Sequence, residues 1–519
     1  MFKKMFVNYF FTLIFFCLTI SSFSQVEGIK TINKEDLRRH LIFIASDSLQ
    51  GRKFGTEISG LEITADYLKD YAQKIGLKPH IDDFFQSVGI IATMPGLGNI
   101  FIEVVNQKKK SVFNTNSVVS LNGRLDALEL EGEEIVIAGF GWQDPGNSYD
   151  DFEGIDVAGK IVIYAQGNPD LYLKGENFSW NNRQERAKFE KVFKQKPKAI
   201  IIASNPKDKK NNTFNRINRW NTRTKYFLNE TNESSDEQAI FLTEPSFVDV
   251  LLGGKGRFKK YLNDISKNKK AYSFLVNDFK INLVVRGTSK LLDAKNVVGI
   301  IEGSDAVLKE ECVIFMAHYD HLGVNNEGEI YNGADDNGSG TVTLMEVAEA
   351  FMSLDQKPKR SIVFLWVTAE EIGMLGSNYY TQNPVFPLDK TVACINLDMV
   401  GRVFEARDSV WDKSPKLVKD FDGLFTLSND VWPKLEQIND SICSELGIIP
   451  DKSLPPGFLR SSDHYYFHEK GVPILNYATG YHADYHKVSD EVSKINFDKI
   501  KRVADLCFLV GLEIANIEK

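Results

Sequence analysis

Four short apolar runs in the second half of the chain constrain its fold more than any other feature. They are CVIFMA (312–317), SIVFLWV (361–367), TVACINL (391–397) and PILNY (473–477). The runs are continuous rather than alternating, and they are rich in β-branched and aromatic residues, which is typical of strands buried on both faces of a parallel sheet. Segments between them, such as 341–354, have apolar residues at helical spacing. Strands that alternate with helices predict an α/β fold with a doubly wound, mostly parallel sheet.

Histidine and acidic residues follow directly after these runs. His318 follows the first run, Glu370 and Glu371 the second, and Asp398 the third, while the loop that holds His486 comes after the fourth. In doubly wound sheets, ligands bind beyond the carboxyl ends of the strands, so we expect these side chains on one rim. A single residue of this kind is usually a helix cap or a loop residue whose hydrogen bonds are satisfied by its neighbours. The whole group is better explained by a metal site, because divalent metals take histidine nitrogen and carboxylate oxygen.

Six motifs in this order resemble those of the M28 (aminopeptidase Y-like) di-zinc peptidases. They are HYD (318–320), GADDNGSG (333–340), TAEEIGMLGS (368–377), NLDMVG (396–401), SDHYYF (462–467) with GVP (471–473), and YHKVSD (485–490). The resemblance covers residues 35–110 and 290–519 and implies the zinc-exopeptidase fold with two zinc ions per chain. By position it implies that His318 and Asp398 bind one zinc and that Glu371 and His486 bind the other. Asp335 is then the carboxylate that bridges them.

The resemblance also implies roles for three further residues. Glu370 would be the general base, which takes a proton from the zinc-bridging water and later passes it to the leaving amine. Asp320 would fix the tautomer of His318. Tyr485 resembles the tyrosine with which some relatives stabilise the tetrahedral oxyanion, although simple packing in its loop is an alternative interpretation.

Two other histidines lie close to the implied ligands. The family spacing H-x-x-x-D favours His486, with Asp490, over His482. In HYDH, the first histidine is favoured over the second, His321.

The implied function is that of an exported metalloaminopeptidase acting on peptides with a free N-terminus. A di-zinc carboxypeptidase or dipeptidase of the same family is an alternative, and it would need arginines such as Arg402 or Arg460 to bind the substrate carboxylate. A glutaminyl cyclase shares the scaffold but commonly uses one metal, and a receptor-like binding protein would have lost catalysis. The chain has neither an H-E-x-x-H nor a G-x-S-x-G motif, which disfavours zincins and serine hydrolases.

The N-terminal region and the middle of the chain predict the domain organisation. Residues 1–24 have the pattern of a signal peptide, with Lys3 and Lys4 before an apolar core and a small-x-small site at 22–24. We therefore expect an exported protein, periplasmic or secreted, without a stable membrane anchor. Residues 25–112 and 286–519 are predicted to form a discontinuous peptidase domain. Residues 113–285 are predicted to be a β-rich insert, which resembles a protease-associated (PA) domain over 148–170 and 188–206.

Charge and cysteine content add two narrower expectations. The chain has 62 basic and 70 acidic residues, a formal net charge of −8, which gives no electrostatic basis for binding nucleic acid. The cysteines beyond the signal peptide lie in apolar segments, so buried free thiols are expected. They are Cys312, Cys394, Cys443 and Cys507. Neither feature predicts an oligomeric state.

Overall fold

The computed structural model describes residues 28–54, 58–80, 83–94, 100–121, 127–174, 183–207, 213–221, 223–229, 239–410 and 416–518. The predicted signal peptide, residues 1–24, lies outside these ranges. No helix in the described ranges is long and apolar enough to cross a membrane. The four cysteines named above are free and buried, as predicted.

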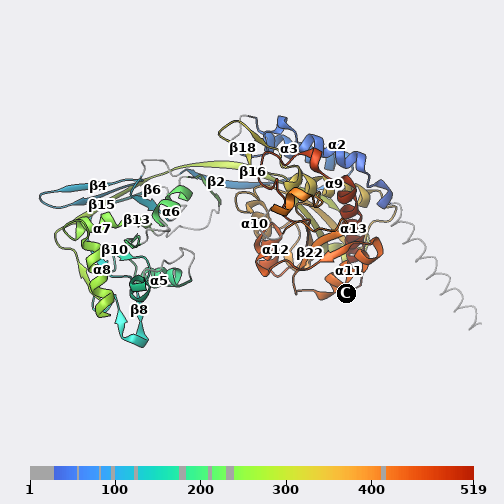
Figure 1. The fold of residues 1–519 in the computed structure, drawn as a ribbon. Helices are drawn as coiled ribbons and strands as arrows, with labels where there is room; N and C mark the ends of the chain where they lie inside the picture. Colours follow the sequence, from blue (N-terminus) through green and yellow to red (C-terminus); the bar gives the residue numbers. More distant parts are fainter. Residues whose placement is uncertain are drawn as a thin grey trace, which may run out of the picture. The chain divides into compact units, whose positions relative to one another are not determined.

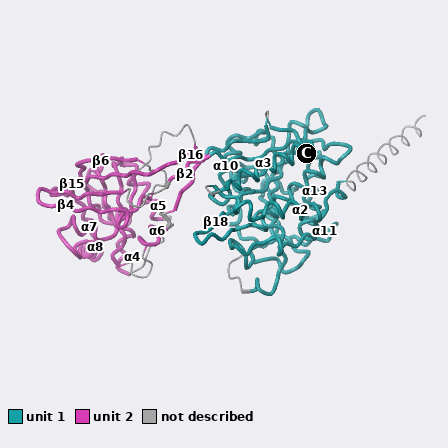
Figure 2. Tube along the Cα trace, turned by 90° about the horizontal axis from the view of Figure 1, so that it is seen from above, with its two compact units in different colours: residues 1–89, 293–519 teal, residues 90–292 magenta. Residues whose placement is uncertain are grey.

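The chain divides into two compact units (Figure 2). Unit 1 consists of Met1–Gly89 and Asp293–Lys519, and unit 2 is Ile90–Leu292. The insert predicted from the sequence, 113–285, lies within unit 2, whose bounds extend beyond it at both ends. The reason is strand pairing: β3 (Ile100–Val105) and β4 (Lys110–Phe113) form one sheet with β15 (Lys280–Arg286), so all three belong to unit 2.

A mixed sheet forms the centre of unit 1 (Figure 1). The four predicted runs are its central strands, and they are parallel: β20 (Ser361–Val367), β17 (Cys312–His318), β21 (Thr391–Leu397) and β24 (Ile474–Ala478). Every residue of β17, β20 and β21 is buried, which explains their continuous apolar pattern. This confirms the predicted fold class.

The outer strands of this sheet extend it on both sides. β16 (Thr288–Ile301) pairs antiparallel with β20, and β1 (Lys78–Pro79) and β2 (Phe85–Met94) lie beyond it. The hydrogen-bonded ladder continues with β12 (Lys225–Leu228), a strand of unit 2 that pairs with residues 90–93 of β2. On the other side, β22 (Gly423–Ser428) runs antiparallel to β24 and is followed by β23 (Ile449–Asp451). Because β2 and β16 both span a unit boundary, they carry the chain from one unit to the other.

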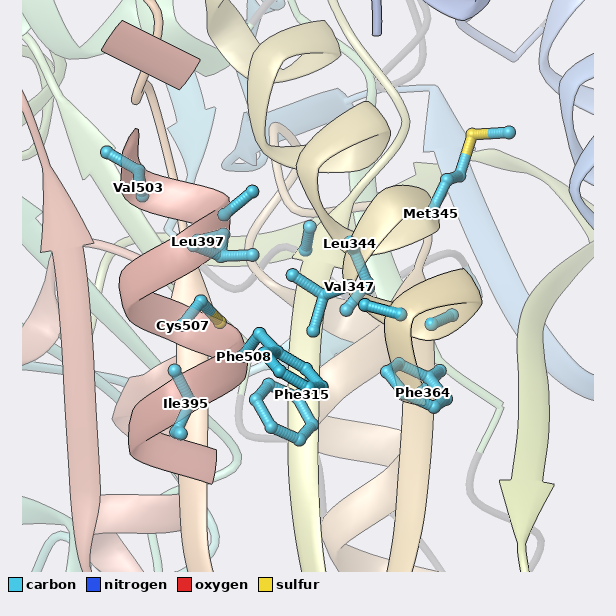
Figure 3. Close-up of a cluster of buried hydrophobic side chains, with 14 of the residues drawn as sticks. Phe315, Leu344, Met345, Val347, Phe364, Ile395, Leu397, Val503, Cys507 and Phe508 are labelled. Carbon is cyan, nitrogen blue, oxygen red and sulfur yellow. The ribbon is translucent and has the colours of Figure 1, made fainter. Parts of the chain in front are cut away.

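Helices cover both faces of the sheet, as the alternation of side chains along a strand requires. One face packs against α2 (Lys34–Ile44), α3 (Gly60–Lys74), α9 (Gly340–Met352), α11 (Pro433–Leu446) and α13 (Phe497–Asn516). The other packs against α10 (Leu375–Gln382) and α12 (His464–Glu469). Figure 3 shows the first face, where Phe315 of β17 and Phe364 of β20 meet Phe508 of α13 and Val347 of α9. The fit is tight, since a Cβ on Gly511 would lie 2.0 Å from the Phe315 ring.

Unit 2 has its own sheets and its own apolar core. In the larger sheet, β7 (Ile135–Ala138), β10 (Ile161–Ala165), β11 (Ala199–Ala203) and β13 (Ala239–Thr243) are parallel. β14 (Ser273–Leu275) and β5 (Val118–Ser120) complete its edges, and β6 (Ala127–Glu133) joins the sheet of β3, β4 and β15. The helices are α4 (Pro169–Lys174), α5 (Arg183–Phe193), α6 (Thr213–Asn221), α7 (Pro245–Leu251) and α8 (Arg257–Asn268). The strand, helix and strand on which the PA resemblance rests are β10, α5 and β11.

Candidate metal centre

The carboxyl ends of three central strands bring the predicted residues together. β17 ends at His318, which pairs in register with Val367, the last residue of β20. Glu370 follows β20 and Asp398 follows β21, so their side chains reach the same rim. His318 Nε2 lies 3.5 Å from Asp398 Oδ1 and 4.0 Å from Glu370 Oε2. The rim predicted from the sequence is therefore present in unit 1.

Asp336, not Asp335, lies between the two groups of potential ligands, which corrects the sequence assignment. Asp336 Oδ1 is 3.6 Å from His318 Nε2, and Asp336 Oδ2 is 3.0 Å from His486 Nε2. Asp335 points elsewhere: its carboxylate accepts the Gly401 N–H at 2.7 Å and lies 3.3 Å from His482 Nε2.

The backbone around these two aspartates explains the difference. Oδ2 of Asp490 accepts the N–H groups of both Asp335 (3.0 Å) and Asp336 (3.1 Å), which fixes the loop. Asp336 has non-helical dihedral angles, φ −100° and ψ 98°, so its side chain departs from the direction of Asp335. Only one of two adjacent aspartates can then reach the rim.

Two clusters of potential metal ligands share Asp336. The first consists of His318, Asp336 and Asp398, and the second of His321, Asp336 and Glu371. Within each cluster the ligand atoms lie within 4.8 Å of one another. Histidine nitrogen and carboxylate oxygen are the donors that zinc accepts, and a shared carboxylate suits two adjacent ions. The side chains present therefore fit two neighbouring metal sites.

Two histidines compete for the second cluster. His321 Nδ1 is 2.8 Å from Glu371 Oε1 and 3.9 Å from Asp336 Oδ2. His486 Nε2 is 3.4 Å from Glu371 Oε2, in addition to its 3.0 Å contact with Asp336. His486 lines the adjacent cleft, whereas His321 is fully buried, and burial lowers the pKa of His321 to about 4. His482 belongs to neither cluster and lies beside Asp335.

The carboxylate of Asp320 contacts the two glutamates of the rim as well as His318. Its carboxylate accepts the backbone N–H groups of Glu370 (3.0 Å) and Glu371 (3.2 Å). The acceptor nearest to His318 Nδ1 is the backbone carbonyl of Asp320, at 3.2 Å, while the carboxylate is 3.7 Å away. The sequence indicates that Asp320 is a neighbour of His318, but it does not predict the contact of Asp320 with the two glutamates that follow β20.

Electrostatics at the rim favour bound cations. Burial raises the pKa values of Glu370 and Glu371 well above their ordinary range. Burial would also raise the pKa of Asp336, but its hydrogen bond with His486 and the nearby histidines bring that pKa below its ordinary value. Among the described residues, Asp398 Oδ1 is buried without a hydrogen-bond partner. Buried carboxylates are costly unless cations are present, which is the situation that divalent metals would relieve.

A cleft opens beside the clusters and combines polar and apolar walls. Asp336, Glu370, Asp398, Tyr485 and His486 line its polar side. The Tyr485 ring stacks on His486 with 3.9 Å between ring centroids. The apolar part of the lining consists mainly of Met399, Phe425, Leu454, Phe458 and Tyr481.

Neither arginine proposed as a carboxylate clamp lines this cleft. Arg402 is buried, donates to Nδ1 of His482 (3.0 Å) and pairs with Asp484 (3.0 Å). Arg460 is exposed and lies over the Tyr465 ring, 5.5 Å from its centroid. Arg52 lies outside the predicted ligand set, and it donates hydrogen bonds to two of the rim loops. The sequence signal for it is the pattern LQGR (49–52), which resembles the family pattern and which we interpret as scaffold beside the cleft.

Comparison with known proteins finds relatives for part of this unit. Residues 296–510 match the sequence model of peptidase family M28. It is 30% identical over 234 residues to aminopeptidase YwaD of Bacillus subtilis (strain 168), covering 44% of this chain and 46% of that protein. It is 32% identical over 163 residues to leupeptin-inactivating enzyme 1 of Streptomyces exfoliatus, covering 31% and 32%. The chain thus spans less than half the length of these two relatives.

A solved structure resembles the chain over almost its full length. The aminopeptidase from Aneurinibacillus sp. strain AM-1 aligns with a TM-score of 0.51 at 17% sequence identity. The alignment covers 95% of this chain and 97% of that one. At this identity the likeness concerns the fold alone.

Proposed function

We propose that this protein is an exported di-zinc metalloaminopeptidase that releases N-terminal residues from peptides. The observation that carries the proposal is the position of Asp336, whose two carboxylate oxygens face His318 on one side and His486 on the other. The match of residues 296–510 to the model of family M28, and the similarity to a relative that is named an aminopeptidase, support the same interpretation.

Five side chains would hold the ions. His318 and Asp398 would bind the first zinc, Glu371 and His486 the second, and Asp336 would lie between them. We favour His486 over His321 because His486 reaches the cleft. Once bound, the two ions supply a nucleophilic water near neutral pH and polarise the scissile carbonyl.

Glu370 would move the proton in this proposal. Its carboxylate lines the cleft, and its backbone is held by Asp320. Burial raises its pKa, so this carboxyl can hold a proton between its removal from the attacking water and its delivery to the leaving amine. Burial also raises the pKa of Tyr485, which keeps its hydroxyl protonated and able to donate to an oxyanion.

The chemistry of the cleft favours peptides that have a free amino terminus and a large apolar side chain on the first residue. An ammonium group is attracted by a rim rich in carboxylates. Met399, Phe425 and Phe458 offer apolar contacts to the first side chain. A carboxypeptidase would need a cation at this cleft, and Arg402 is instead bound to Asp484. The aminopeptidase reading is therefore preferred to the carboxypeptidase one.

Mass spectrometry of a digested peptide mixture tests this proposal. Half of the peptides are N-acetylated, and a parallel reaction contains a chelator. We expect stepwise shortening of free N-termini only, fastest at large apolar residues, abolished by the chelator and restored by zinc. Trimming from the C-terminus irrespective of acetylation would replace the proposal by a carboxypeptidase. Absence of cleavage by zinc-loaded protein would favour a binding protein.

Export is a separate part of the proposal and rests on residues 1–24 alone. Cell fractionation followed by N-terminal sequencing tests it directly. We expect mature protein outside the cytoplasm that begins at Gln25. Cytoplasmic protein with an uncleaved N-terminus would remove export from the proposal without affecting the catalytic part.

A further inference from the structure

Arg52 is a fully buried arginine whose guanidinium, within the described part of the chain, donates hydrogen bonds only to backbone carbonyl groups. Nε donates to the carbonyl of Tyr319 at 2.8 Å, and Nη1 donates to those of Ile44 at 2.7 Å and Asn332 at 2.6 Å. Nη2 donates to the carbonyl of Gly333 at 3.0 Å. The side chain has 0% exposure, and no ion pair to a carboxylate is found for it among the described residues. One planar group thus joins four carbonyls on three separate segments of the backbone.

Two of the joined loops carry the proposed metal ligands. Tyr319 lies between His318 and Asp320, and Gly333 begins the loop that leads to Asp336. Both loops are distant in sequence from Arg52, and they supply ligands to the same metal cluster. The guanidinium fixes their separation, because its N–H groups form a rigid fork.

The backbone around Arg52 reinforces the connection. The carbonyl of Arg52 accepts the His321 N–H at 3.1 Å, and that of Gly51 accepts the Gly323 N–H at 3.0 Å. Gln50, Gly51 and Arg52 all have left-handed backbone angles, with φ of 45°, 66° and 49°. A Cβ on Gly51 would lie 2.5 Å from the carbonyl oxygens of Gly323 and Tyr331. The turn is therefore fitted closely to the loop that contains His318 and His321.

Arg52 also brings positive charge to an acidic region. Burial lowers its pKa to about 10, while Asp320, Asp336 and other nearby carboxylates act in the opposite direction. The side chain is therefore charged at neutral pH. Its charge lies behind the loops rather than in the cleft, where the ions would bind.

We propose that Arg52 is a positioning residue that sets the spacing of the His318 loop and the Asp336 loop for metal binding. The inference rests on the proposed function, since it concerns the affinity of the zinc sites. Lysine cannot replace this arginine, because a single nitrogen cannot reach carbonyls on all of these segments. Loss of such a supporting contact typically weakens metal binding by about 10- to 100-fold.

The test compares Arg52→Met and Arg52→Lys with a matched control, Arg360→Met. Arg360 is equally buried and also donates to backbone carbonyls, those of Ile514 (3.2 Å) and Ile517 (2.6 Å). It precedes β20, at the strand end opposite to Glu370. Both methionine variants lose a buried guanidinium group, but only position 52 lies beside the rim.

Zinc affinity and the cobalt spectrum are the two readouts. Affinity is measured by competition with a fluorescent zinc chelator, and ligand geometry by the visible absorption of cobalt-loaded protein. For both Arg52 variants we expect zinc affinity at least about tenfold below that of the parent chain and an altered cobalt spectrum. Arg360→Met should lower the melting temperature but leave both readouts unchanged. Parent-like affinity and spectrum in the Arg52 variants would overturn the inference.

Hydrogen exchange on the unaltered protein keeps the test decisive if the variants do not fold. We expect zinc to slow the exchange of the His321 and Gly323 amides, which donate to Arg52 and Gly51. Unchanged exchange would contradict the role of this turn. If the parent chain binds no zinc at all, the proposed function fails, whereas equal zinc binding by parent and variants defeats only the inference about Arg52.

Discussion

At the scale of single residues, two adjacent aspartates have different surroundings. Asp336 faces His318 and His486, while Asp335 faces Gly401 and His482. The GADDNGSG motif does not distinguish them, because both are polar residues in a glycine-rich loop. What distinguishes them is the backbone, because Asp336 has non-helical dihedral angles in a loop that the carboxylate of Asp490, more than 150 residues further along the chain, holds through both N–H groups. A long-range contact of this kind cannot be predicted from local spacing.

Substitution of each aspartate by asparagine should separate their roles. Asp336→Asn removes the charge shared by both clusters, so we expect most of the bound zinc to be lost. Asp335→Asn keeps an oxygen for the Gly401 N–H and should retain zinc, with a loss of stability of about 1–3 kcal/mol. Elemental analysis after gel filtration measures the zinc, and urea unfolding measures the stability. Zinc loss in the Asp335 variant only would restore the original sequence assignment.

Substitution of Glu370 tests its role as the base. Glu370→Gln keeps the size of the side chain but cannot take up a proton. We expect bound zinc close to that of the parent chain, with kcat reduced by about 10²- to 10⁴-fold. Kinetics on an N-terminal leucine substrate, combined with elemental analysis, measure both quantities. Retained turnover at full zinc occupancy would exclude Glu370 as the base.

At the scale of secondary structure, the sequence predicts the strands better than the domain boundaries. β17, β20, β21 and β24 were recognised because burial on both faces makes their apolar runs continuous. β3 lies outside the predicted insert, 113–285, and β15 lies at its C-terminal edge, whereas unit 2 contains both strands. Their mutual pairing links residues about 180 positions apart, from Glu103 to Asn282, and the alternating pattern of a strand does not indicate its partner.

Helix α2 contributes a pH dependence to the stability of unit 1. His40 is buried and its ring contacts the Tyr67 hydroxyl of α3. Burial lowers the pKa of His40 from 6.5 to about 4, so between these values the unfolded chain binds a proton that the folded chain does not. The contribution of His40 to the free energy of unfolding is therefore fully present above pH 6.5. It falls as the pH drops towards 4, by at most about 1.4 kcal/mol per pH unit.

His40→Gln provides the comparison, since glutamine is polar and does not titrate. Urea unfolding of both chains, with chelator present throughout, isolates this effect from protonation of metal ligands. We expect the variant to lose less stability than the parent chain as the pH falls from 6.5. An equal loss in both chains would show that His40 does not contribute.

At the scale of the whole molecule, two separate cores predict two unfolding transitions. The apolar core of unit 1 packs on the two faces of its central sheet. Unit 2 has a separate apolar core. Zinc binding to unit 1 should stabilise that unit only, by about 2.7 kcal/mol when free zinc is about 100 times its Kd. Differential scanning calorimetry with zinc or with chelator measures both transitions. A single transition, or equal shifts of both, would contradict independent units.

Anomalous X-ray scattering at the zinc absorption edge, from crystals of the zinc-loaded protein, tests the central claim most directly. The account predicts two peaks on either side of the Asp336 carboxylate. One should lie among His318, Asp336 and Asp398, and the other among Asp336, Glu371 and His486. A single peak, a peak beside Asp335 or no peak at this rim would contradict the di-zinc centre and the mechanism built on it.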